Sequence, residues 1–120
     1  MKLENQVTNL ELSKKLKELG FKQESLFYWG KTLGKFEIIY FPGNLTKSDA
    51  EIGRVSAFTV AELGEMLPEF VMSMRRTDDY LCTDFMNYRP YDYGKHEAET
   101  EADARAKMLI YLIENDLIKK

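Results

Sequence analysis

The chain is poor in two residue types that often mark structural and catalytic sites. It contains one cysteine, Cys82, and one histidine, His96, in 120 residues. A single cysteine excludes an intramolecular disulfide and is typical of a reducing compartment, so we expect a cytoplasmic protein. A single histidine with no cysteine beside it lacks the ligand set of a structural zinc site, so we expect no bound metal.

Long apolar runs are absent as well. The first residues, MKLENQVTNL, contain no apolar signal region, and no uninterrupted apolar run approaches the about 20 residues that a membrane span needs. We therefore expect neither secretion nor insertion into a membrane.

The sequence also lacks the charge pattern and the glycine motifs of many nucleotide-binding proteins. The net charge is −3, and no region carries the basic excess that binding of duplex nucleic acid requires. Neither G-x-G-x-x-G nor G-x-x-x-x-G-K occurs, and no G-x-S-x-G sequence ties a serine into a catalytic triad. We expect no cofactor and no catalytic residues.

What is present is the composition of an ordinary globular domain. Hydrophobic residues make up 44% of the chain and charged residues 31%, and the length fits a single domain over residues 1–120. Aromatic residues make up 12%, which favours a substantial sheet.

Three segments begin with a threonine that is followed three residues later by an acid, the pattern of a helix N-cap. The threonines are Thr8, Thr59 and Thr100. They predict helices over about residues 9–19, 60–67 and 101–114. The last segment, TEADARAKMLIYLIENDLI, has the broadest apolar stripe at helical spacing, and we interpret it as a core element.

Four segments have the composition and alternation of strands. FKQESLFYWG and KFEIIYF predict one hairpin bounded by Gly30 and Gly34, and FVMSMRR and YLCTDFMNY predict another, with Phe70, Met72 and Met74 pointing inward. Pro42 ends the second strand, and RPYDYGKHEAE leads the chain out of the sheet. The prediction is an α+β fold in the order α-β-β-α-β-β-α, with about four antiparallel strands and three helices packed on one face.

The most suggestive combination of side chains is aromatic and basic. It comprises Tyr28, Trp29, Arg75, Arg76, Tyr88, Arg89, Tyr91 and Tyr93. Tryptophan, tyrosine and arginine dominate protein–protein hot spots, and the same residues stack on exposed bases and pair with phosphates. The tyrosines could equally cover the sheet and bond their hydroxyls locally. The acidic net charge favours a protein partner over nucleic acid.

Two further residues have a sharper and a simpler interpretation. Cys82 lies in the alternating strand YLCTDFM and is expected to be a small buried hydrophobe instead of a nucleophile. His96 precedes Glu97, Glu99 and Glu101, which would suit a metal ligand or a general base, but acids before a helix are expected from the helix dipole alone.

Three segments together resemble a set of small uncharacterised proteins encoded by bacteriophages, prophages and related mobile elements, notably of gut bacteria. They are LGFKQESLFYW (19–29), AFTVAELGEMLP (57–68) and TEADARAKMLIYLIEN (100–115). The resemblance implies a phage-derived gene in a bacterial cytoplasm. It carries no catalytic motif, so it implies no functional residue.

The sequence therefore predicts a non-enzymatic protein-interaction module of phage or prophage origin. The alternatives are a single-stranded nucleic-acid-binding protein that uses the same aromatic and basic residues, and a metal-dependent hydrolase that uses His96 and nearby acids. The expected partner is a protein. A homodimer stays open, because the wide apolar helix could bury its excess surface against a second copy.

Overall fold

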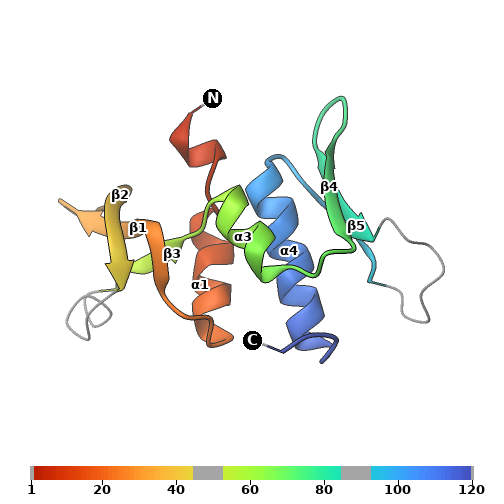
Figure 1. The fold of residues 1–120 in the computed structure, drawn as a ribbon. Coiled ribbons are helices and arrows are strands. Elements are labelled where there is room, and N and C mark those ends of the chain that lie inside the picture. The colour runs from red at the N-terminus through yellow and green to blue at the C-terminus, as the bar shows by residue number, and fades with distance from the viewer. Residues whose placement is uncertain (1, 45–52, 85–92, 120) are drawn as a thin grey trace.

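The computed structural model describes residues 2–44, 53–84 and 93–119. In these residues three α-helices lie between two three-stranded antiparallel sheets, one at each end of an elongated molecule of 49 × 32 × 20 Å (Figure 1). The α+β class predicted from the sequence is confirmed.

The first sheet and the first helix come from the N-terminal half of the chain. A short 3-10 turn, η1 (Leu3–Asn5), precedes helix α1 (Leu10–Glu18). The strands that follow are β1 (Glu24–Thr32), β2 (Lys35–Asn44) and β3 (Val55–Ala57), and their order in the sheet is β2-β1-β3. Strand β1 is therefore central, and β2 and β3 form the edges.

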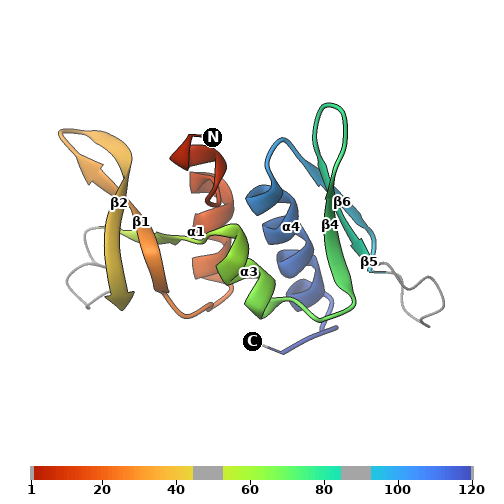
Figure 2. The same cartoon turned by 45° about the horizontal axis from the view of Figure 1, so that its top comes forward.

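The second sheet follows helix α3 (Val60–Met66) and precedes helix α4 (Glu101–Glu114). Its strands are β4 (Val71–Arg75), β5 (Tyr80–Asp84) and β6 (Lys95–Ala98), and they lie in sequential order. Figure 2 shows the helices between the two sheets from a second direction.

The prediction of one sheet of about four strands is wrong. The described strands number six and form two sheets, because each predicted hairpin gains a third strand, β3 or β6. Strand β3 has only three residues, and β6 is the polar segment Lys-His-Glu-Ala that the sequence assigns to the exit from the sheet. Both are strands because a neighbour pairs with them, not because of an alternating pattern of their own.

The predicted helices are confirmed, but the capping of two of them differs from the prediction. Asn9, not Thr8, caps α1: its side chain accepts a hydrogen bond from the N–H of Leu12 at 2.8 Å. Thr59 forms the complete capping box with Glu62. Thr100 caps α4 by accepting the N–H of Asp103 at 3.2 Å, but the Asp103 carboxylate does not complete a capping box as Glu62 does in α3.

That acid, Asp103, reaches the first helix instead. Its Oδ1 accepts the backbone N–H of Asn9 at 2.8 Å, and its Oδ2 accepts the Asn9 side-chain amide at 3.1 Å. Asp103 is 9% exposed, and burial raises its pKa, an effect that the bonds from Asn9 oppose. The carboxylate therefore ties the N-terminal ends of α1 and α4 together.

The predicted hairpins are present with different details. Strand β1 continues through Gly30 to Thr32, and β2 continues past Pro42 to Asn44, with a register shift between Ser25 and Phe27. The predicted inward direction of Met72 and Met74 is wrong, since they are 37% and 38% exposed.

The inward face of β4 carries Ser73 instead. Its hydroxyl donates to Glu101 at 2.5 Å and accepts from the Nε of Arg105 at 2.9 Å, which fixes β4 against α4. On the neighbouring strand, Cys82 is fully buried, as predicted.

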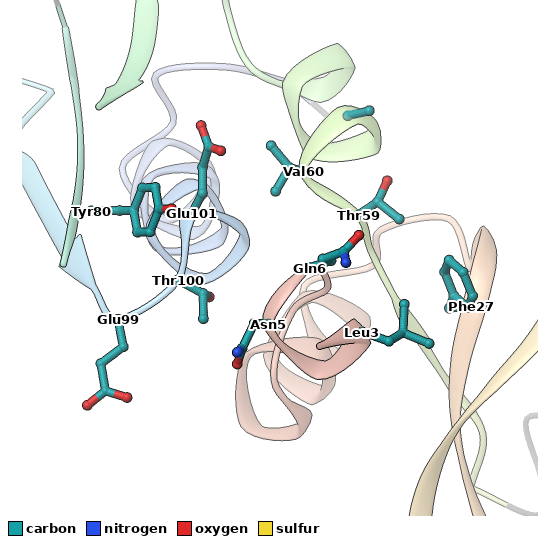
Figure 3. Close-up of a pocket in the computed structure, with 11 residues that line it drawn as sticks. Leu3, Asn5, Gln6, Phe27, Thr59, Val60, Tyr80, Glu99, Thr100 and Glu101 are labelled. Carbon is teal, nitrogen blue, oxygen red and sulfur yellow. The ribbon is translucent and has the colours of Figure 1, made fainter. Parts of the chain in front are cut away.

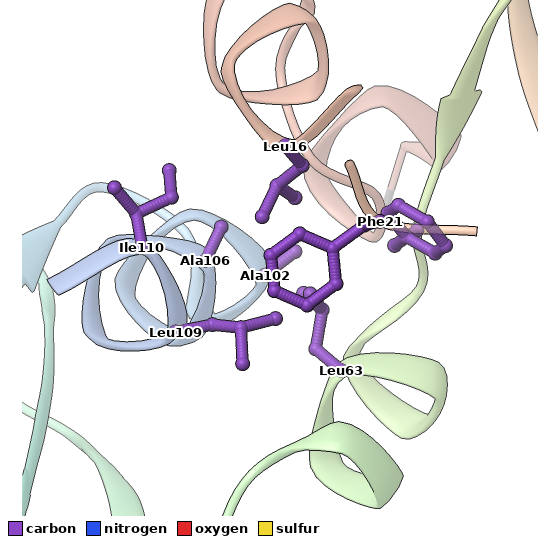
Figure 4. Close-up of a cluster of buried hydrophobic side chains, with 8 residues drawn as sticks. Leu16, Phe21, Leu63, Ala102, Ala106, Leu109 and Ile110 are labelled. Carbon is purple, nitrogen blue, oxygen red and sulfur yellow. The ribbon is translucent and has the colours of Figure 1, made fainter. Parts of the chain in front are cut away.

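Helix α4 is the centre of the core. One side of it packs with α1 and α3 in a cluster built from Leu16, Phe21, Phe58, Leu63, Ala102, Ala106, Leu109 and Ile110 (Figure 4). Another side packs against the second sheet in a cluster built from Cys82, Tyr93, Ala104, Met108 and Leu112. The wide apolar stripe of α4 is thus buried within one chain, so it gives no reason to expect a dimer through this helix.

Candidate functional site

The two predicted binding residues of the first sheet are engaged inside the protein. Tyr28 is 1% exposed, and its hydroxyl donates to the backbone oxygen of Gln23 and accepts the N–H of Ser25. The indole N–H of Trp29 donates to the backbone oxygen of Thr8 at 2.8 Å. Both side chains therefore stabilise the first sheet and its contact with the segment before α1.

The predicted residues of the second sheet are only partly free to meet a partner. Arg75 is exposed, whereas Arg76 pairs with Asp79 through its Nε at 2.7 Å and lies 3.4 Å from Glu97. The bond from Arg76 lowers the pKa of Asp79. Tyr93 is 7% exposed, and its ring centroid lies 4.8 Å from that of Phe70.

The structure does not bring the described members of this set together. Tyr28 and Trp29 belong to the first sheet, Arg75 and Arg76 lie at the far end of the second hairpin, and the helices lie between the two sheets (Figure 1). Tyr88, Arg89 and Tyr91 lie outside the described residues. Single-stranded nucleic-acid binding by these residues stays a prediction.

His96 is held by local contacts. Its Nε2 lies 3.0 Å from the backbone oxygen of Tyr93, and its ring centroid lies 5.0 Å from that of Tyr111. Within residues 2–44, 53–84 and 93–119, no group of three or more histidine, cysteine or acidic side chains is arranged to hold a metal ion. The hydrolase alternative therefore has no assembled set of metal ligands among the described residues, and it stays a prediction.

The structure contains a groove of about 840 Å³, which we call the N-terminal groove. It lies where η1 faces the starts of α3 and α4 (Figure 3). Its lining residues are Leu3, Asn5, Gln6, Phe27, Thr59, Val60, Ala61, Tyr80, Glu99, Thr100 and Glu101.

Three contacts between distant segments hold the walls of the groove. The backbone of Val7 forms an antiparallel bridge with Thr59, which places η1 beside α3. The N–H of Phe58 also donates to the buried hydroxyl of Thr8 at 3.1 Å. The contact of Asp103 with Asn9 fixes α4 against the other side of the same segment. The groove is therefore formed by well-anchored backbone.

The chemistry of the groove is apolar inside and acidic at the rim. Leu3, Phe27 and Tyr80 contribute apolar side-chain surface, and Leu3 is 39% exposed. Glu101 is already bonded to Ser73 and lies 3.6 Å from Arg105, so its charge is balanced within the protein. Glu99 is exposed and points away from the helices in Figure 3, so it adds a carboxylate at the rim.

Sequence reasoning does not identify this groove. Its residues come from five segments of the chain, and the local patterns in those segments, such as the caps at Thr59 and Thr100, predict helices and strands but not that the five segments meet. Leu3 carries the weak signal that exists in the sequence, because it is the one apolar residue among the polar residues 2–6.

No protein-family model, curated protein or solved structure matches this chain. Of the helices described in the structure, none has both the length and the apolar content needed to cross a membrane.

Proposed function

We propose that this chain is a non-enzymatic protein-interaction module, of phage or prophage origin, that binds a short segment of a partner protein in the N-terminal groove. The observation that carries the proposal is the groove itself. Its volume of about 840 Å³ lies in the range typical of ligand-binding sites, and its walls combine apolar side chains with a few polar groups. The phage or prophage setting depends on the resemblance of the three sequence segments alone.

The groove residues favour a peptide as the ligand. Phe27 and Tyr80 offer aromatic surface to an apolar side chain, and aromatic residues dominate the energetics of protein interfaces. Asn5 carries an amide that both donates and accepts, which suits the N–H and C=O groups of a peptide backbone. The carboxylate of Glu99 favours a peptide with a basic residue next to the apolar side chain that enters the groove.

Blocking the groove tests the proposal. Ala61 is exposed on the first turn of α3 and lines the groove, so Ala61→Trp fills space there without replacing a core side chain. Glu11→Trp places the same side chain on an exposed position in the first turn of α1, outside the groove, and is the matched control.

The measurement is binding of peptides selected from a random library on the immobilised full chain. We expect selected peptides to pair an apolar anchor with a basic residue. Their affinity should fall at least tenfold, about 1.4 kcal/mol, for Ala61→Trp and stay unchanged for Glu11→Trp. Peptides that bind both variants equally, or a selection that yields no binder, would refute groove binding.

A further inference from the structure

Strand β2 is the unusual edge among the described sheets. It has ten residues and forms an outer edge of the first sheet, whereas the other edge strands, β3, β4 and β6, have three, five and four. Natural proteins protect sheet edges with short strands, charges or proline. In β2 the charged residues Lys35 and Glu37 precede the centre, and residues 38–41, Ile-Ile-Tyr-Phe, carry no charge.

The central side chains of this edge are open to solvent. Tyr40 is 66% exposed and Phe41 is 42% exposed, although Tyr40 lies against Phe27 of β1 with ring centroids 5.5 Å apart. An apolar edge of this length is a template for pairing with another strand.

The hairpin turn determines which backbone groups of β2 face outward. The two-residue loop has positive φ at both positions, 51° at Leu33 and 82° at Gly34, and it closes on the pair Thr32 and Lys35. Such a loop closes on a hydrogen-bonded pair, and hydrogen-bonded and non-hydrogen-bonded pairs alternate along an antiparallel ladder.

Residues 35, 37 and 39 therefore exchange bonds with β1. The intervening residues, Phe36, Ile38 and Tyr40, direct their N–H and C=O groups away from β1, to an edge that pairs with no other described strand.

We propose that this edge pairs with the same edge of a second copy of the chain, β2 antiparallel to β2, with Ile38 opposite Ile38. In this register Phe36 lies opposite Tyr40 of the second copy, so every outward-facing residue of the segment meets an outward-facing residue. A twofold axis at Ile38 makes the two edges self-complementary, as a symmetric dimer requires. The first sheets of the two copies then form one continuous sheet.

Neighbouring registers are less favourable for reasons of charge and hydrogen bonding. Centring the pair on residue 37 places Glu37 opposite Glu37, and like charges directly opposite are destabilising. Centring it on residue 39 places Phe36 opposite Pro42, which has no N–H to donate. With Ile38 at the centre, Lys35 and Glu37 each lie opposite an uncharged residue.

Disulfide trapping tests the register. Directly opposite residues of a hydrogen-bonded antiparallel pair have Cα atoms about 5.5 Å apart, which a disulfide spans without strain. Ile38→Cys should therefore form a covalent dimer in a glutathione redox buffer. Leu33→Cys is the control: Leu33 is fully exposed and so more accessible to random collision, but it lies far from its counterpart in the dimer. Equal cross-linking of the two variants would overturn the proposal.

Sizing with light scattering tests the dimer without a new cysteine. The wild-type mass should rise with concentration from 14.0 kDa toward twice that value. Tyr40→Lys should weaken the dimer at least tenfold, and Leu33→Lys, with the same change in charge outside the contact, should leave it unchanged. A wild-type chain that stays monomeric, or a dimer that survives Tyr40→Lys, would overturn the proposal. Ala61→Trp in the N-terminal groove should not affect dimerisation, so failure of one proposal is distinguishable from failure of the other.

Discussion

Gly64 and Arg105 give the sharpest test of the packing between α3 and α4. A Cβ added at Gly64 would lie 2.5 Å from the Nη1 of Arg105, far closer than two unbonded atoms approach. That nitrogen donates to the backbone oxygen of Val60 at 2.9 Å, and the Nε of the same side chain donates to Ser73 at 2.9 Å. We therefore expect Gly64→Ala to be destabilising, although alanine is the better helix former.

The two opposing terms have known sizes. Replacing glycine by alanine inside a helix stabilises it by about 1 kcal/mol. Displacing the guanidinium costs its hydrogen bond to Val60, about 1.5–3 kcal/mol for a charged donor. The net destabilisation of Gly64→Ala should therefore be about 0.5–2 kcal/mol. In an Arg105→Met background the collision is absent, so the same substitution should stabilise the protein by about 1 kcal/mol.

Urea denaturation of the wild type, the two single variants and the double variant measures both effects. This double-mutant cycle should give a coupling free energy of about 1.5–3 kcal/mol between the two substitutions. The effect of Gly64→Ala on stability should change sign between the wild-type and the Arg105→Met backgrounds. If Gly64→Ala stabilises the wild type as much as it stabilises Arg105→Met, the guanidinium does not occupy the space beside Gly64, and the described packing is wrong.

Three further predictions concern buried groups. Burial raises the folded-state pKa of Asp103, so this carboxyl loses its stabilising contribution as the pH rises through that pKa. From about pH 4 to about pH 7, the difference in urea stability between the wild type and Asp103→Asn should therefore shift in favour of the variant. A difference that stays constant over this range would contradict the prediction. The Ser56 hydroxyl is buried and has no hydrogen-bond partner among the described residues, so Ser56→Ala should leave the stability unchanged or raise it. Ser13→Ala should cost about 1 kcal/mol, because the Ser13 hydroxyl bonds to Asn9 and Thr8, and thermal unfolding compares the two variants. Burial raises the pKa of Cys82 to about 12, so a thiol reagent at about pH 8 should label it only as fast as the protein unfolds, and rapid labelling of the native protein would show that the strand is open.

The sequence alone determined the features that depend on short-range interactions. The helix starting at Thr59 is an example: its capping box links residues only three positions apart, so the signal and the structure lie in the same segment. Helix α4 is another, because the repeat of its apolar residues specifies both the helix and its buried side. The burial of Cys82 followed from alternation within one strand.

Tertiary structure decided everything that depends on which distant segments meet. Strand β3 forms by pairing with β1, and β6 forms by pairing with β5. The sequences of β3 and β6 do not indicate which strand each will pair with. Asp103 bonds Asn9 of another helix although its spacing from Thr100 fits a local capping box. The N-terminal groove needs five segments at once. A local pattern specifies hydrogen bonds and periodicity over a few residues, whereas contacts between distant segments depend on how all the elements bury their apolar faces together.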